Sequence, residues 1–409
     1  MDFPRALVVF CVFLLAYLSL QLFLFFRIRD YLRSQIPDRS RRTLYSGLVG
    51  CFFLLMLFPL AWRSMSASHP YGPDPWLVRG LFAVFAVWGF GSSGSALVLL
   101  CYDFFRRLAR PRSVRPGPQI GRRNFLRKSV VVAAAAPFVI SGHGVLLGRR
   151  RFRVEHFDLP VSGLSSSLAQ LSIVHLTDIH VGPFMSPEEL AAYVEAVNRL
   201  KPDLIALTGD FISRGLDEVA PCVEILAGLK ARYGIFACMG NHEVLVGVED
   251  EMTRLFTREG VRVLRNDAAS IPIHNTTLNI LGIDDLRWGD PDLSRAVTIA
   301  QRQPGEVGLL LSHRPEVFPE AFREGIDVVL SGHYHGGQVK LGPEPESLSI
   351  ASLLTPYAEG LFHLSRRDRF SAPGGKDALL FVSRGIGTTG LPIRVNCPPQ
   401  IAHLTLKKA

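Results

Sequence analysis

The chain has 409 residues, of which 48% are hydrophobic and 20% charged, so it can hold two or three domains and is too apolar for a disordered protein. Its net charge of +9 is unevenly divided. Residues 1–149 contain 19 Lys and Arg against 5 Asp and Glu, whereas residues 150–409 contain 26 against 31. The positive charge accompanies the most apolar third of the chain, which favours membrane topology and leaves no support for a nucleic-acid partner.

Four apolar stretches without charged residues lie in this first third. They cover residues 6–26, 44–62, 80–102 and 129–148, and about 20 helical residues suffice to cross a hydrocarbon core of about 30 Å. We therefore predict four transmembrane helices in a membrane region, residues 1–149, followed by a second domain, residues 150–409. Glycines and serines gather at residues 89–95, which predicts close helix packing by the third span.

The basic residues between these stretches predict the orientation. Six arginines lie between the first two spans and nine basic residues between the third and fourth, but only Arg63 and Arg79 lie between the second and third. Basic loops stay in the cytoplasm, so residues from about 150 onward are expected outside it. The arginines that follow the fourth span, Arg149, Arg150, Arg151 and Arg153, argue in the opposite direction.

A further export signal precedes the fourth span. Residues 121–127, Gly-Arg-Arg-Asn-Phe-Leu-Arg, resemble a twin-arginine signal, which is read by a receptor and directs folded proteins across the membrane. Such signals usually lie near the start of a chain, and here Arg122 and Arg123 are internal. The alternative is an ordinary basic flank of a transmembrane helix.

From residue 171 the chain alternates short apolar runs with helical patterns. Strands are predicted at 171–176, 203–207, 234–238, 278–283, 307–311 and 327–330. Helices are predicted after Ser186, which is followed by Pro187 and acidic residues, and at 218–231 and 250–259. This alternation predicts an α/β domain with layered sheets.

Polar side chains follow five of the predicted strands, where α/β sheets place their ligands. They are Asp178 and His180, Asp210, Asn241 with His242 and Glu243, His313, and His333 with His335. Mixed imidazole and carboxylate ligands suit zinc, iron or manganese, and this set is too large for one tetrahedral zinc. It fits two metal ions that share a bridging carboxylate. Gly209, Gly240 and Gly332 are expected to allow the sharp exit from each strand.

The ordered series DxH, GD, GNHE, H and GHxH resembles the calcineurin-like metallophosphoesterase superfamily over residues 150–409. The segments GHYHGGQV and SRGIGTTGLPIRVNCPPQ look like its YkuE/YaeI-like bacterial branch, although Tyr334 stands where that branch often has Thr. The resemblance implies a four-layer α-β-β-α domain that holds two metal ions, manganese, iron or zinc.

By the same resemblance, one metal is held by Asp178, His180, Asp210 and His335, and the other by Asp210, Asn241, His313 and His333. A hydroxide that bridges the metals then attacks phosphorus in line. His242 resembles the catalytic histidine that stabilises the phosphoryl oxygens or protonates the leaving group. Glu243 either orients a histidine or is a solvated acid at a helix start, and Arg384 and Arg394 either bind a substrate phosphate or are structural.

These features together predict a membrane-anchored phosphodiesterase or phosphomonoesterase. We expect it in the bacterial inner membrane, with the catalytic domain on the periplasmic or external side and a phosphate-ester substrate, a lipid-linked one included. One alternative is a cytoplasmic hydrolase of the pyrophosphate in a UDP-2,3-diacylglucosamine-type lipid precursor. Another is a membrane scaffold without activity. The sequence leaves the leaving group, the metal identity and the oligomeric state open.

Overall fold

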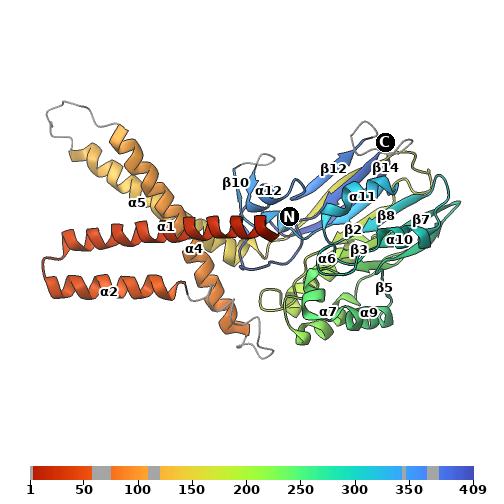
Figure 1. The fold of residues 1–409 in the computed structure, drawn as a ribbon, viewed down its shortest axis with the longest axis horizontal. Helices are drawn as coiled ribbons and strands as arrows, with labels where there is room; N and C mark the ends of the chain where they lie inside the picture. The colour runs from red at the N-terminus through yellow and green to blue at the C-terminus, as the bar shows by residue number, and fades with distance from the viewer. Residues whose placement is uncertain (1–2, 58–74, 109–119, 343–346, 366–376) are drawn as a thin grey trace. The chain divides into compact units, whose positions relative to one another are not determined.

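The computed structural model describes residues 3–57, 75–108, 120–342, 347–365 and 377–409 (Figure 1). The chain divides into two compact units. The first holds the residues up to Leu147 together with Leu391–Ile393, and the second holds Gly148–Gly390 and Arg394–Ala409.

Long apolar helices make up the first unit. They are α1 (Phe3–Gln35), α2 (Arg39–Leu55), α4 (Pro75–Leu108) and α5 (Ile120–His143), which continues as a π-helical turn over Gly144–Gly148. Among the described residues, three segments are long and apolar enough to cross a membrane: Cys11–Gln35, Val78–Leu108 and Lys128–Gly148. The described residues therefore support three candidate spans, whereas we predicted four.

The predicted span at 44–62 is the one that lacks support. Helix α2 has 17 residues and ends at Leu55, so at 1.5 Å per residue it reaches only about 25 Å of the roughly 30 Å required. Residues 58–62 of that prediction lie outside the part of the chain that the structure describes.

The glycine- and serine-rich segment at residues 89–95 of the third predicted span packs closely against a neighbouring helix, as expected. A Cβ added at Gly91 would lie 2.3 Å from the ring of Phe138, and one at Gly94 would lie 2.6 Å from Pro137, so α4 and α5 approach closely there. On another helix, Gln21 of α1 donates a hydrogen bond of 2.9 Å to the hydroxyl of Ser92. Small and polar residues thus connect these helices in the way that membrane helices commonly use.

The second unit contains two six-stranded sheets. The first has the order β1-β14-β2-β3-β4-β5, in which β14 runs antiparallel to β2 and all other neighbours are parallel. Its strands are β1 (Arg153–Val161), β14 (Gln400–Lys408), β2 (Ser172–Leu176), β3 (Leu204–Thr208), β4 (Ile235–Cys238) and β5 (Val261–Val263).

The second sheet has the order β12-β13-β9-β8-β7-β6, with antiparallel pairs only at its two edges. Its strands are β12 (Gly360–Leu364), β13 (Ala378–Val382), β9 (Val328–Ser331), β8 (Val307–Leu311), β7 (Thr276–Gly282) and β6 (Asp267–Ile273). A short hairpin joins β10 (Lys340–Leu341) to β11 (Leu348–Ser349).

Three apolar clusters order these elements into layers. One cluster joins the two sheets face to face and includes Ile173, Phe236, Leu309 and Phe381. A second packs α6 (Pro187–Leu200), α7 (Val219–Leu226) and α9 (Glu249–Arg258) against the first sheet. A third packs α10 (Leu293–Ala300) and α11 (Phe318–Arg323) against the second sheet. The order is therefore helices, sheet, sheet, helices.

The predicted elements agree with these bounds to within a residue or two, with one exception. Helix α6 starts as predicted, because the Ser186 hydroxyl accepts from the backbone N–H of Glu189 in a capping box. The helix predicted at 218–231 is wrong in length, since a 3₁₀ turn (Leu216–Glu218) precedes α7 and α7 ends at Leu226. Gly228 follows that end, and glycine costs about 1 kcal/mol inside a helix.

Candidate metal centre

Every polar residue that we predicted for the site lies just beyond the carboxyl end of a strand. Asp178 and His180 follow β2, and Asp210 follows β3. Asn241 and His242 begin the short helix α8 (Asn241–Val246) after β4. His313 follows β8, and His333 and His335 follow β9. The strands come from both sheets, so the site joins the two halves of the sandwich.

Five of these residues adopt the left-handed backbone conformation that L-amino acids rarely use. Their φ values are 53° for Asp178, 52° for His180, 54° for Asp210, 75° for His333 and 52° for His335. Such strain gathers at functional sites, because the surrounding structure must hold it in place. Each turn directs a polar side chain back toward the ends of the strands.

The glycines act differently from one another. Only Gly209 has the positive φ, 80°, that its turn requires. A Cβ at Gly240 would lie 2.4 Å from the backbone nitrogen of Asp210, and one at Gly332 would lie 2.2 Å from a carboxylate oxygen of Asp178. At Gly240 and Gly332 it is therefore close approach, and not backbone conformation, that requires glycine.

The first cluster of ligand atoms contains Asp178, His180 and His335, all buried. His335 Nε2 lies 3.2 Å from Asp178 Oδ1 and 3.1 Å from His180 Nε2. The Nε2 of His180 also lies 3.6 Å from Asp210 Oδ2. Two imidazole nitrogens and one carboxylate oxygen thus lie within 4.8 Å of one another, and an oxygen of Asp210 adjoins His180.

The second cluster contains Asp210, His313 and His333. His313 Nε2 lies 3.2 Å from Asp210 Oδ2 and 3.2 Å from His333 Nδ1. The same Asp210 oxygen faces His180 of the first cluster, so it lies between the two groups of nitrogens. His242 adjoins both, with its Nε2 3.9 Å from Asp210 Oδ2.

The sequence is similar to proteins described as metallophosphoesterases. The family model for calcineurin-like phosphoesterases matches residues 171–337. An uncharacterized metallophosphoesterase of Aquifex aeolicus is 30% identical over 62% of this chain and 92% of its own length. This chain belongs to the calcineurin-like phosphoesterase family.

Two further relatives extend this comparison. The uncharacterized metallophosphoesterase YkuE of Bacillus subtilis is 28% identical over 71% of this chain and 98% of its own length. A transmembrane protein with metallophosphoesterase domain from Danio rerio is 28% identical over 69% of this chain and 63% of its own length. The family depends on two metal ions, and the apolar helices of this phosphoesterase indicate membrane association.

The side chains of the site fit a metal pair. The Nδ1 atom of His180 is buried and has no hydrogen-bond partner, and its Nε2 atom lies 3.1 Å from His335 Nε2. Imidazole and carboxylate ligands of this kind suit manganese, iron and zinc. The donor set is therefore right in type, whereas the ligand role of each residue, Asn241 included, stays a prediction.

Without metal, a proton on His313 supplies positive charge in the place of the cations. Burial disfavours a charge on His313, but the carboxylate of Asp210, helped by Asp178, raises the pKa of His313 to about 10. Burial opposes charge on Asp210 too, yet His313 holds the pKa of Asp210 well below its usual value. Burial lowers the pKa of His180 to about 3, so the ring is neutral and the lone pair of one nitrogen is available. A bound cation would displace the His313 proton, because metal and proton compete for the same nitrogen.

Glu243 is buried beneath the cluster, so the alternative of a solvated acid at a helix start is wrong. Its carboxylate accepts backbone N–H groups from Asp210 at 3.0 Å, Phe211 at 2.8 Å, Ile212 at 3.3 Å and Gly240 at 2.8 Å. Burial, reinforced by the nearby Asp210 charge, raises the pKa of Glu243 to about 7. Glu243 thereby fixes the loop of Asp210 to the loop of Asn241, and does not orient a histidine.

Sequence reasoning missed Arg314. Its guanidinium donates to His333 Nε2 at 2.6 Å, to Asn241 Oδ1 at 3.1 Å and to the buried Asp285 carboxylate at 2.7 Å. The only signal in the sequence is its place directly after His313. A cation this close to the cluster is suited to bind an anionic ligand.

Arg384 and Arg394 are structural in this fold. Arg394 is buried and donates to the carbonyls of Arg384, Gly385, Gly387 and Cys397. Arg384 donates to Glu155 of β1 at 2.5 Å. Both guanidinium groups are therefore engaged inside the protein.

His175 lies in the core of β2, as expected, and gives a prediction for stability against pH. Its Nε2 is 2.8 Å from the Thr208 hydroxyl, and burial lowers its pKa to about 3. In the unfolded chain His175 takes up a proton near pH 6.5, whereas in the folded chain it stays neutral down to much lower pH. Acid therefore favours the unfolded state. We expect metal-free protein to lose about 2 kcal/mol of stability through this group between pH 8 and pH 5.

The measurement is denaturant unfolding in chelator at both pH values. His175→Gln should show a loss that is smaller by that amount, while the exposed His274→Gln should behave like the unmodified protein. An equal acid loss in all three proteins would contradict the assignment.

Proposed function

We propose that this chain is a membrane-anchored, two-metal phosphoesterase that hydrolyses a phosphodiester or phosphomonoester. The observation that carries the proposal is the position of Asp210 Oδ2, 3.2 Å from His313 Nε2 and 3.6 Å from His180 Nε2. A carboxylate oxygen shared by two groups of imidazoles is the arrangement expected of a bridging ligand.

In this proposal Asp178, His180, Asp210 and His335 hold one metal, and Asp210, Asn241, His313 and His333 hold the other. Two metals, when bound, supply an activated water and neutralise charge on the phosphoryl group. The left-handed turns and the buried Glu243 keep these ligands in place, so little reorganisation is needed when substrate arrives.

His242 is proposed as the catalytic histidine. Its Nδ1 lies 2.5 Å from the Ser213 carbonyl oxygen. A carbonyl oxygen can only accept a hydrogen bond, so Nδ1 carries the ring hydrogen and donates the hydrogen bond. The Nε2 atom, which faces the cluster, is then the atom that gains or loses a proton. The protonated ring can donate to a phosphoryl oxygen or to the leaving oxygen.

Arg314 is proposed to bind a non-bridging oxygen of the substrate. We expect Arg314→Lys to lower kcat/KM about 10- to 100-fold, because one charge-assisted hydrogen bond contributes about 1.5–3 kcal/mol. The exposed Arg287→Lys is the matched control. Metal content should be unchanged in both proteins, and loss of metal in Arg314→Lys would assign Arg314 to ligand support instead.

The proposed activity is tested on the full chain in detergent. After removal of metal, manganese, iron or zinc should restore hydrolysis of bis-aryl phosphates or aryl phosphates, and a panel of nucleotides and lipid pyrophosphates then defines the leaving group. No hydrolysis by protein that binds metal would support the scaffold alternative.

We further propose that the protein lies in a bacterial inner membrane with the catalytic domain outside the cytoplasm. Both arginine-rich loops stay inside only if residues 44–62 cross the bilayer. If α2 does not cross, only one of these loops can lie in the cytoplasm, and the domain lies outside when that is the loop with nine basic residues. The side chains of Arg122 and Arg123 lie outside the described residues, so the twin-arginine signal stays a prediction.

Labelling of the full chain in intact spheroplasts with a membrane-impermeant amine reagent decides the side, whichever route carries the domain. Labelling of lysines in residues 150–409 without opening the membrane is the expected result. Labelling of these lysines only after detergent opens the membrane would overturn the export proposal and favour the cytoplasmic pyrophosphate hydrolase.

A further inference from the structure

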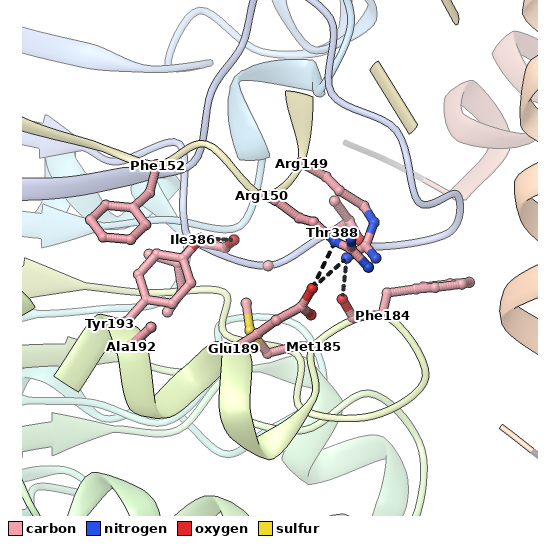
Figure 2. A pocket seen from close by; sticks show the side chains of 11 residues that line it. Arg149, Arg150, Phe152, Phe184, Met185, Glu189, Ala192, Tyr193, Ile386 and Thr388 are labelled. Carbon is pink, nitrogen blue, oxygen red and sulfur yellow. Dashed lines mark hydrogen bonds and ion pairs between the residues drawn. The ribbon is translucent and has the colours of Figure 1, made fainter. Parts of the chain in front are cut away.

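A cavity of about 120 Å³ lies at the start of the second unit, apart from the predicted metal ligands (Figure 2). Its apolar wall is made by Phe152, Met185, Tyr193 and Ile386. The rings of Phe152 and Tyr193 lie side by side with their centroids 4.6 Å apart. A dry cavity of about 150 Å³ can hold benzene, so this space suits the first part of an acyl chain.

The other side of the cavity is charged. Arg149 donates to the Phe184 carbonyl at 2.8 Å, and Arg149 and Arg150 lie 3.5 and 3.0 Å from the carboxylate of Glu189 (Figure 2). The residues that line the cavity include two arginines and one acid, so more basic than acidic side chains face it. The side chain of Arg150 is 59% exposed, so an incoming anion can reach it.

A buried hydroxyl also lines the cavity. Thr388 is 5% exposed, and its Oγ1 atom has no hydrogen-bond partner. A buried polar atom is costly when it is left unsatisfied, which indicates that this one has a partner in the working protein. A ligand with polar oxygen atoms would supply it.

Chain connectivity sets where this cavity lies. The candidate span Lys128–Gly148 ends immediately before Arg149. Its 21 residues extend about 31 Å, which matches the hydrocarbon thickness, so Arg149 and Arg150 fall in the headgroup region. An anionic phosphate beside arginines and acyl chains below it are what that region contains.

We propose that this cavity binds one anionic phospholipid of the surrounding membrane. The phosphate contacts Arg149 and Arg150, and the beginning of an acyl chain lies against Phe152 and Tyr193. Ile386 and Gly387 donate backbone N–H groups to the carbonyls of Thr177 and Asp178, so the lipid contacts the loop that supports the metal ligands. The lipid is bound and not cleaved, and the proposal does not depend on the catalytic one.

The test is photolabelling of the full chain in nanodiscs of phosphatidylcholine that contain a small fraction of diazirine-bearing phosphatidylglycerol. Peptide mapping should find a peak of label between Phe184 and Tyr193. Unlabelled phosphatidylglycerol should compete and glycerol phosphate should not, and diazirine-bearing phosphatidylcholine at the same fraction should give no such peak, because the site needs both the negative charge and the chains.

Three variants complete the test. Arg150→Gln should reduce the label about fivefold, while the neighbouring exposed Arg151→Gln, which removes the same charge outside the cavity, should not. Ala192→Phe fills the cavity and should remove the peak, and a normal unfolding transition shows that it has folded.

Several results would overturn the proposal. They are label spread evenly over the spans, equal loss in Arg150→Gln and Arg151→Gln, or a peak that persists in folded Ala192→Phe. Competition by glycerol phosphate would reduce the cavity to an anion site, and an equal peak with diazirine-bearing phosphatidylcholine would reduce it to a general apolar site.

Discussion

Asp210→Asn should lower phosphoesterase activity about a thousandfold, the largest effect of any single substitution that we expect. The carboxylate faces His180 and His313 at once, so both proposed metal positions lose a ligand. The several kcal/mol that a metal pair supplies to the transition state correspond to a factor of this size. Activity with an aryl phosphodiester and metal content per chain are the two measurements.

The control for Asp210→Asn is Asp290→Asn, an exposed carboxylate in the same domain. It should retain full activity and two metals per chain. An Asp210→Asn protein with two metals and normal turnover would remove the bridging role and, with it, the main support for the proposed mechanism.

Glu243→Ala should be the most destabilising change at the site. The substitution leaves four buried N–H groups without an acceptor, and each unsatisfied donor costs about 1–3 kcal/mol, so a loss of about 4 kcal/mol or more is expected. For a domain of this size that loss lowers Tm by about 8–16 °C. Thermal unfolding of metal-free protein measures it without a contribution from metal binding.

Glu251 offers the comparison, because it is an exposed acid near the start of α9. Glu251→Ala should change stability by no more than about 0.5 kcal/mol. Glu243→Gln, which keeps one acceptor oxygen, should fall between the two. If Glu243→Ala were as mild as Glu251→Ala, the four hydrogen bonds would not hold the two loops together.

The central strands of the domain were predictable because their signal is local. Strand β8 has the predicted bounds, since Val307–Leu311 is an unbroken apolar run that is buried along its whole length. Strands β1, β5, β6, β12, β13 and β14 were not predicted, although β13 (Ala378–Val382) is itself a buried apolar run. In β14 apolar residues alternate with polar ones, and the strands that pair with it, β1 and β2, are far away in the sequence. Pairing between strands so far apart cannot be recognised from a short stretch of sequence.

The same distinction applies to the site. The structure brings together the side chains that follow apolar strands, because the carboxyl ends of parallel strands share one edge of a sheet. Arg314 and Glu243 differ, since what they do depends on which loops the fold brings within 3.5 Å of them. Sequence spacing left Glu243 with two alternatives, and its four N–H contacts with two loops fit neither of them.

The pairing of β1 with β14 has a mechanical consequence. Strand β1 begins a few residues after the last candidate span and, in the described sheet, pairs only with β14, through nine residues from Arg153 opposite Gln400 to Val161 opposite Lys408. A tension between bilayer and domain acts along β1 and loads this whole ladder in shear, so its hydrogen bonds resist together instead of opening one by one. The force with which the membrane can pull on the catalytic domain is therefore limited by the strand farthest from the membrane helices in the sequence.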